Sequence, residues 1–329
     1  MATEIRSVPM LDHEITGPQA WTGETVSARD YVVPIPPQCA AELQVALDVL
    51  RQHRVPTLLL DPADFELAAC RDLMQTVREK LDRGTLFAVL DRLALADKTI
   101  EDATAQYWLL ASLLARPVPQ KFDGTMFYDV RDTGATMKPG SGIRPTVTNL
   151  DLTFHNDNSY NETPPHYVAL LCLSKSKSGG VSRVMSVATI HNELLKRYPE
   201  ALPRLYRPFW YDRHKEHLPQ EPNAHVAPLF TYDGQLRARI ALHEIFGGYE
   251  LRGETMDDET AEAIAAVHEV FDTPGLSIEL QFEPGQIQFV NNRATGHART
   301  SFTDGDGPAE KRHLIRLWLR DAGRRSYRG

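Results

Sequence analysis

The sequence lacks the features of a secreted, membrane-spanning or nucleic-acid-binding protein. Its three cysteines, Cys39, Cys70 and Cys172, are too few and too widely spaced for a disulfide framework or a CxxC metal pair. No stretch approaches the roughly 18 apolar residues that would span a bilayer, and no basic segment followed by an apolar one opens the chain. Acidic residues outnumber basic ones by 44 to 36 and the net charge is −8, so neither a nucleic acid nor a membrane is expected as a partner. These absences predict a cytoplasmic protein.

Composition predicts one large globular domain. Of the 329 residues, 42% are apolar and 24% are charged, which is ample for a buried core. No internal repeat or low-complexity segment divides the chain. We therefore expect a single domain over residues 1–329, with a mainly helical portion that includes a few strands at 1–123, a β core with helical insertions at 124–320 and a tail at 321–329.

Apolar periodicity assigns the coarse secondary structure. Apolar residues at spacings of three and four predict helices at 40–53, 65–81, 100–114, 187–197 and 258–271. A short apolar run bounded by Gly84 and Asp91 predicts a buried strand at 85–90. Short β-branched and aromatic runs, broken by turn-forming residues, predict strands at 167–173, 182–186, 276–282, 287–290 and 313–319. This texture is typical of an antiparallel sandwich or barrel.

Three pairs of residues have the spacing of a His-x-acid metal motif. They are His155/Asp157, His191/Glu193 and His214/Glu216. Residues two apart share a face only on an extended strand, because a helix sends them roughly 200° apart. The second pair lies in a helical pattern and the third in a polar, solvated loop. The first pair follows a strand-like alternation, so His155 and Asp157 are the best candidates for chelating one metal ion.

A third ligand must come from elsewhere in the chain, and His297 is the best candidate. It follows the predicted strand 287–290 and a polar turn. Two neutral imidazoles and one carboxylate leave open positions on a metal, an arrangement that suits Fe(II) and its need to bind a cosubstrate and O₂.

Two arginines lie in a predicted strand near the C-terminus. Alternation places on one face Arg312, Leu314, Arg316 and Trp318. Arginines that face a sandwich interior are costly unless each meets an anion. A dicarboxylate supplies one, because guanidinium binds a carboxylate through two parallel hydrogen bonds. The alternative is a solvent-exposed strand face.

Taken in order, these motifs resemble the taurine dioxygenase and clavaminate synthase-like superfamily. The resemblance runs from about residue 124 to the C-terminus and rests on His155-x-Asp157, Gly179-Gly-Val-Ser182, the segment from Asn291 to Phe302 and Arg312-x3-Arg316. It implies an α+β fold with a mainly β core, a double-stranded β-helix (jelly roll, cupin-like), with N-terminal and inserted helices packed outside.

The resemblance also implies roles for single residues. His155, Asp157 and His297 would bind Fe(II), Arg312 would pair with the distal carboxylate of 2-oxoglutarate, and Ser182, where relatives often carry threonine, would add a hydroxyl group. The implied activity is a dioxygenase that uses Fe(II), 2-oxoglutarate and O₂ to oxidise an unactivated C–H bond, releasing succinate and CO₂. Relatives that chlorinate lack the metal-binding carboxylate, so Asp157 favours hydroxylation or desaturation.

The sequence defines the substrate less well. Arg316 could meet an acidic group of the substrate or form an internal salt bridge, and Arg131 could do either at the pocket wall. Asn149 and Asp151 precede the metal motif and are further candidates to line the pocket. The expected substrate is a small, acidic or amino-acid-like molecule. A zinc-dependent hydrolase with the same triad and a non-catalytic jelly-roll binding protein remain alternatives, and a homo-oligomer stays open.

Overall fold

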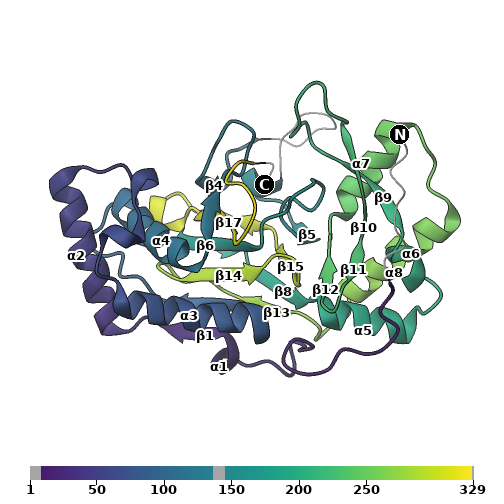
Figure 1. Ribbon diagram of the computed structural model, residues 1–329, viewed down its shortest axis with the longest axis horizontal. Coiled ribbons are helices and arrows are strands. Elements are labelled where there is room, and N and C mark those ends of the chain that lie inside the picture. Colours follow the sequence, from purple (N-terminus) through teal and green to yellow (C-terminus); the bar gives the residue numbers. More distant parts are fainter. Residues whose placement is uncertain (1–8, 136–144, 328–329) are drawn as a thin grey trace.

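A seven-stranded sheet forms the centre of the computed structural model, which describes residues 9–135 and 145–327 (Figure 1). Its strand order is β1-β2-β14-β6-β17-β3, with β4 paired to β17. The strands are β1 (Val32–Pro34), β2 (Phe87–Asp91), β14 (Ile287–Asn291), β6 (Tyr167–Ser174), β17 (His313–Arg320), β3 (Arg116–Val118) and β4 (Tyr128–Val130). Three of these strands, β6, β14 and β17, are central and almost wholly apolar on one face, as expected for strands covered by helices.

A second sheet of four antiparallel strands faces the first. Its order is β13-β8-β15-β5, and the strands are β13 (Ile278–Leu280), β8 (Ser182–Ser186), β15 (Thr295–Arg299) and β5 (Leu152–His155). Phe87 and Val290 of the large sheet share one buried cluster with Val184 and Leu280 of the small one. The two sheets are therefore packed face to face through apolar side chains.

Three helices cover the outer face of the large sheet, at the purple and blue end of Figure 1. They are α2 (Pro37–His53), α3 (Ala68–Arg83) and α4 (Ile100–Leu114), and a four-residue helix, α1 (Ala28–Tyr31), precedes them. Helix α4 begins at Ile100 because Thr99 and Asp102 form a capping box. Leu43, Leu73 and Leu109 pack in one cluster with Phe289 and Leu317 of the sheet. Burial of this face anchors the helical layer to the strands.

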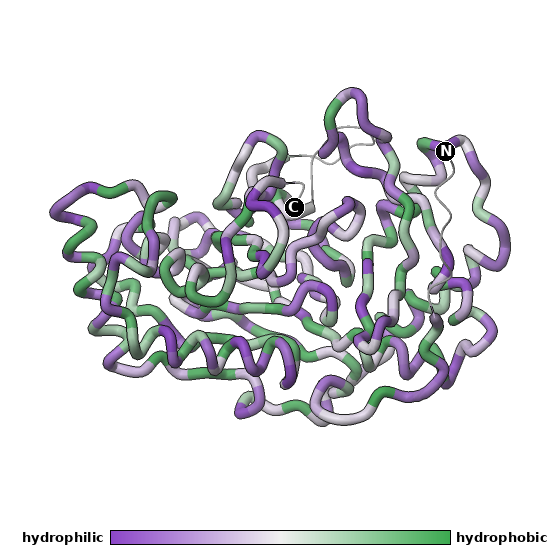
Figure 2. Tube along the Cα trace, in the orientation of Figure 1, coloured by the Kyte–Doolittle hydropathy of each residue, from purple (hydrophilic) through white to green (hydrophobic). Residues whose placement is uncertain are grey.

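The opposite end of the molecule, at the right of Figure 1, is a second layer of helices and short hairpins. It contains α5 (Val187–Arg197), α6 (Leu202–Leu205), α7 (Leu242–Arg252), α8 (Asp258–Phe271) and the hairpins of β9 (Pro208–Asp212) with β10 (Ala224–Pro228) and β11 (Phe230–Tyr232) with β12 (Leu236–Ala238). Strands β7 (Ser178–Gly179) and β16 (Phe302–Thr303) form a further short pair. Figure 2 shows hydrophobic segments running through both ends, and Phe154 and Ala298 of the small sheet join the apolar cluster of this second layer.

Most of the predicted elements are confirmed, and the differences have local causes. The predicted helices at 100–114, 187–197 and 258–271 have these bounds in the structure, as does the strand at 182–186. The predicted strand at 276–282 is shorter in the structure, where it pairs with β8 only over Ile278–Leu280. The hairpins and α7 between residues 208 and 252 were not predicted, since their strands are short and mixed in polarity.

Two cysteines that are far apart in the sequence lie in contact. The Sγ atoms of Cys39 on α2 and Cys70 on α3 are 2.7 Å apart, and all three cysteines are free and buried. Among the described residues, no helix combines the length and the apolarity that crossing a membrane requires.

Candidate active site

His155, Asp157 and His297 meet at one edge of the small sheet. His155 ends β5 and lies opposite His297 of β15 in the strand register, while Asp157 follows in the next turn. The Oδ1 atom of Asp157 is 3.5 Å from Nε2 of His155 and 3.7 Å from Nε2 of His297. One ligand atom from each of the three residues lies within 4.8 Å of the others. Three donors of this kind on one side of a point fit a metal ion that keeps open positions.

The two imidazoles are presented with their Nε2 atoms toward the common point. Nδ1 of His155 lies 2.9 Å from the carbonyl oxygen of Thr153, which favours the tautomer with a free lone pair on Nε2. Burial, together with the charge of the neighbouring His155, lowers the pKa of His297. A neutral imidazole is the form that binds a metal, so the surroundings favour the ligand form of His297.

Asp157 is the most heavily bonded residue of the three. Its carboxylate accepts hydrogen bonds from Nη1 of Arg316, at 3.1 Å, and from Nε1 of Trp318, at 2.6 Å. Burial alone would raise the pKa of Asp157, but the charge of Arg316 and the bonds from His155 and His297 hold that pKa well below its usual range. The carboxyl group is therefore ionised and fixed in orientation.

Two asparagines hold the backbone around the three residues. The side chain of Asn292 accepts from the backbone N–H of Asp157, at 2.8 Å, and donates to its carbonyl, at 2.9 Å. The side chain of Asn156 donates to the carbonyl of Thr295, at 2.7 Å, and accepts from the backbone N–H of Ile240, at 2.6 Å. Neither asparagine received a role from the sequence, although Asn292 lies within one of its motifs.

A fully buried glutamine positions Arg316. The side-chain oxygen of Gln120 accepts from Nε of Arg316 at 2.8 Å, and its amide donates to the carbonyls of Met126 and of Arg316 itself, both at 2.7 Å. Gln120 belongs to no recognisable motif and lies 196 residues before Arg316, so sequence reasoning missed it. Since Arg316 also bonds Asp157, the internal salt bridge that the sequence left open is present.

A cavity of about 370 Å³ opens beside the three residues. Its wall includes Arg316, Trp318 and Asp151, and it also includes His214 and Glu244, whose Nε2 and Oε1 atoms are 3.0 Å apart. His214 lies in a turn, as expected, but its side chain is only 27% exposed and lines the cavity. The chain after β9 turns back toward α7, and the contact with Glu244, the second residue after the α7 start at Leu242, carries the histidine to the cavity.

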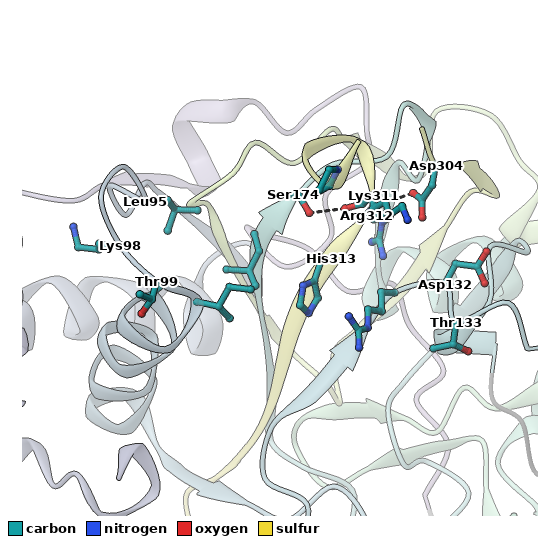
Figure 3. A pocket seen from close by; sticks show the side chains of 15 residues that line it. Leu95, Lys98, Thr99, Asp132, Thr133, Ser174, Asp304, Lys311, Arg312 and His313 are labelled. Carbon is teal, nitrogen blue, oxygen red and sulfur yellow. Dashed lines mark hydrogen bonds between the residues drawn. The ribbon is translucent and has the colours of Figure 1, made fainter. Parts of the chain in front are cut away.

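Arg312 does not line this cavity but lines a second pocket, of about 690 Å³ (Figure 3). The side chain is 5% exposed, and its Nη1 atom is buried with no hydrogen-bond partner among the described residues. Burial and the neighbouring charge of Arg299 lower the pKa of Arg312 to about 10. Gly180 allows the close approach, since a Cβ there would lie 3.0 Å from Cδ of Arg312.

The other residues that the sequence proposed for the site have different positions relative to the cavity and the pocket. Ser182 is buried on β8, opposite Arg299 in the register. Arg131 lines the pocket of Arg312 and not the cavity of the three metal-ligand candidates. Asn149 is exposed, and its carbonyl accepts from the backbone N–H of Phe302 at 3.1 Å. Asp151 is exposed at the rim of the cavity.

The model of one protein family, taurine catabolism dioxygenase TauD, TfdA family, matches residues 56–318, which is most of the chain. The chain belongs to this family. It is therefore a non-haem iron dioxygenase that uses 2-oxoglutarate and O₂. The donors of His155, Asp157 and His297 fit that metal, because they are two imidazoles and an ionised carboxylate converging on one point.

Three relatives of this dioxygenase extend the comparison. FR-33289 synthase of Streptomyces rubellomurinus is 28% identical over 317 residues, covering 95% of this chain and 92% of the relative. A crystal structure of asparagine oxygenase with Fe(II), hydroxyasparagine and succinate has a TM-score of 0.65 at 21% identity, covering 88% of this chain and 93% of that one. The iron oxygenase OrfP, solved with Fe, succinate and hydroxy-L-Arg, has a TM-score of 0.64 at 14% identity, covering 88% and 94%. The two structures share the mixed α/β fold of this chain.

Proposed function

We propose that this dioxygenase hydroxylates an unactivated C–H bond of a small, amino-acid-like substrate, with iron held by His155, Asp157 and His297. The observation that carries the proposal is the convergence of the ligand atoms of these three residues on one point, where His155 and Asp157 line a cavity whose wall also includes Arg316. Bound iron, with 2-oxoglutarate and O₂, supplies the oxidising chemistry that breaks the C–H bond and releases succinate and CO₂. The chain itself contributes orientation and the exclusion of water.

Arg312 and Ser182 bind the distal carboxylate of 2-oxoglutarate in this proposal. Both side chains are buried, and Arg312 keeps a donor that has no acceptor among the described residues. A guanidinium group in that state is suited to a carboxylate, which offers two acceptor oxygens and the opposite charge. Nε2 of His155 and of His297 and Oδ1 of Asp157 hold the metal, while Arg316 and Trp318 hold the Asp157 carboxylate in place.

The charges in the cavity favour a zwitterion as the substrate. Arg316 can bind a carboxylate there, and Glu244 can bind an amine. Burial opposes the ionisation of Glu244, but the hydrogen bond from His214 lowers the pKa of that carboxyl group. The relatives solved with hydroxyasparagine and hydroxy-L-Arg support an amino acid. Asp151 at the rim is a further contact for the substrate. Arg131 lines the pocket of Arg312, and the exposed Asn149 receives no role in this proposal.

We also propose that the two facing sheets are the layers of a double-stranded β-helix and that residues 1–329 work as one catalytic domain. The proposal is supported by strands β1, β2 and β3 of the N-terminal portion, which join the same sheet as β17. At the other end, Tyr327 is buried and its ring lies 6.4 Å from that of Trp318. The last two residues of the segment 321–329 and the first eight of 1–123 lie outside the described residues.

The test is an anaerobic titration with Fe(II) and 2-oxoglutarate, followed by the weak visible band expected near ~500 nm for this chelate. The wild-type protein should develop the band, and His297→Ala should not. Turnover is then scored as succinate release with a panel of amino acids against matched carboxylic acids and amines. Absence of the band at saturating iron and cosubstrate would contradict the metal assignment. Equal stimulation by compounds that lack either charge would contradict the amino-acid-like class.

A further inference from the structure

Arg299 lies on the face of β15 that carries the metal-ligand candidate His297. The two residues are two apart in an unbroken stretch of pairing with β8, so their side chains point to the same side of the sheet. In that register Arg299 lies directly opposite Ser182. Residues that face each other across antiparallel strands project their side chains together. Arg299 therefore belongs to the wall that holds Ser182.

The guanidinium group of Arg299 is buried and only partly bonded. The residue is 4% exposed. Its Nη2 atom donates to the carbonyl of Thr148, at 3.1 Å, and to that of Leu150. Nε and Nη1 are buried and have no partner within the described residues. Buried donors without an acceptor are costly, so two of them on one charged group indicate an acceptor supplied by a ligand.

Arg299 and Arg312 come together over one aromatic ring. The Cζ atoms of the two arginines lie 4.8 Å and 5.4 Å from the centroid of Phe302. Within residues 9–135 and 145–327, Nη1 of Arg312 is also a buried donor without a partner. Neither guanidinium makes an ion pair with a carboxylate in the part of the chain that the structure describes. Two buried like charges side by side destabilise each other until an anion lies within reach of both.

We propose that Arg299 is a third binding residue for the distal carboxylate of 2-oxoglutarate, acting together with Arg312 and Ser182. The inference rests on the proposed role of Arg312 and Ser182. It adds a consequence of its own: with two guanidinium groups around one carboxylate, the site selects strongly for 2-oxo acids that end in a second carboxylate and against those that end in a methyl group.

The experiment compares two cosubstrates in each variant. Binding of 2-oxoglutarate and of 2-oxobutyrate, which lacks the distal carboxylate, is titrated anaerobically in the Fe(II) protein for wild type, Arg299→Gln and Arg299→Lys. We expect Arg299→Gln to weaken 2-oxoglutarate binding by roughly 10- to 100-fold and to leave 2-oxobutyrate binding unchanged. Arg299→Lys should fall between wild type and Arg299→Gln. The ratio of the two dissociation constants is internal to each variant, so a loss of folded protein cancels.

Arg183→Gln is the matched control. Arg183 follows Ser182 on β8 but points to the other face, where its Cζ lies 5.0 Å from the ring centroid of Phe154. For Arg183→Gln, the ratio of the dissociation constants for the two cosubstrates should equal that of the wild type. If Arg299→Gln weakens both cosubstrates equally, or neither, Arg299 only supports the loop at Thr148 and the inference is wrong. If the wild type itself shows no preference for 2-oxoglutarate, the proposed role of Arg312 and Ser182 fails, which is a distinguishable result.

Discussion

The arginine at the start of strand β17 and the arginines within the strand have opposite surroundings. Arg312, Arg316 and Arg320 recur every fourth residue on one face of the strand, and all three are buried. Arg316 is bonded by Gln120 and Asp157, and Arg320 donates to the carbonyls of Thr163, Ser326 and Tyr327. The side chain of Arg312 makes no hydrogen bond to any described residue.

The difference separates arginines that are held by acceptors within the protein from one whose guanidinium group has no acceptor among the described residues. A buried guanidinium with protein acceptors is a fixed part of the wall and orients its neighbours, as Arg316 does for Asp157. A buried guanidinium without acceptors destabilises the free protein, and the anion that it binds relieves this cost. Arg312, just before β17, and Arg316, within it, point to the same side of the sheet, so the acceptors nearby decide which role each has.

The largest expected effect is a difference in the free energy of unfolding between variants of Arg316 and of Arg312. Arg316→Leu leaves the carboxylate of Asp157 buried without its counter-charge, and we expect a loss of about 3–5 kcal/mol in the free energy of unfolding of the metal-free protein. Arg312→Leu removes an unpartnered charge and should change that free energy by less than about 1 kcal/mol, or raise it. Urea unfolding of both variants gives the comparison. Equal destabilisation would remove the distinction between the two arginines.

A smaller effect is expected from the residue that positions Arg316. Gln120→Leu deletes the acceptor for Nε of Arg316, and we expect the Michaelis constant for the substrate to rise about tenfold while that for the cosubstrate stays unchanged. Gln106→Leu is the control, because Gln106 is also buried but bonds only the carbonyl of Leu43 in the helical layer. A rise in both Michaelis constants would mean that Gln120 supports the whole site and not Arg316 in particular.

The parts of this site that the sequence could predict are those with a local pattern. His155 and Asp157 are two apart beside a strand, and Arg312 and Arg316 follow a period of two, so alternation alone indicates that each pair shares a face. Whether the arginine face is buried depends on the small sheet, since Trp318 on that face packs with Val184 and Leu280. The sequence alone left a solvent-exposed face open.

The parts that the sequence could not predict are the long-range partners. Gln120 reaches Arg316 across 196 residues, and Asn292 reaches Asp157 across 135. No periodicity records such contacts, because each depends on the way the strands of the two sheets come together. His214 is a further example. The charged residues around it predict a solvent-exposed side chain, but its contact with Glu244, distant in the sequence, brings it to the wall of the cavity. The state of Arg299 is likewise visible only once its neighbours are placed.

Trp318 holds the carboxylate of the metal-ligand candidate Asp157, as Arg316 does. Its Nε1 atom donates to Oδ2 of Asp157 at 2.6 Å, from the same face of β17 as the arginines. We expect Trp318→Phe to lower the affinity for Fe(II) about tenfold, because partners that orient a metal ligand contribute at this level. Trp108→Phe, which loses a bond of 3.0 Å to the carbonyl of Leu60 in the helical layer, should leave iron binding unchanged. Competition with a chelator measures the affinity of both variants.

The smallest expected effect concerns the buried side chain of His191, which, unlike the buried arginines, is neutral in the folded protein at neutral pH. Burial lowers the pKa of His191 to about 4, from an ordinary value of 6.5. Between these values the unfolded chain binds a proton that the folded protein does not, so the free energy of unfolding falls as the pH falls through this window. His191 should contribute a slope of up to about 1 kcal/mol per pH unit. Urea unfolding from neutral pH to about pH 5 should show a shallower slope for His191→Gln and the wild-type slope for His53→Gln, at an exposed site on α2. A wild-type slope in His191→Gln would mean that this histidine is charged in the folded protein, as the arginines of β17 are.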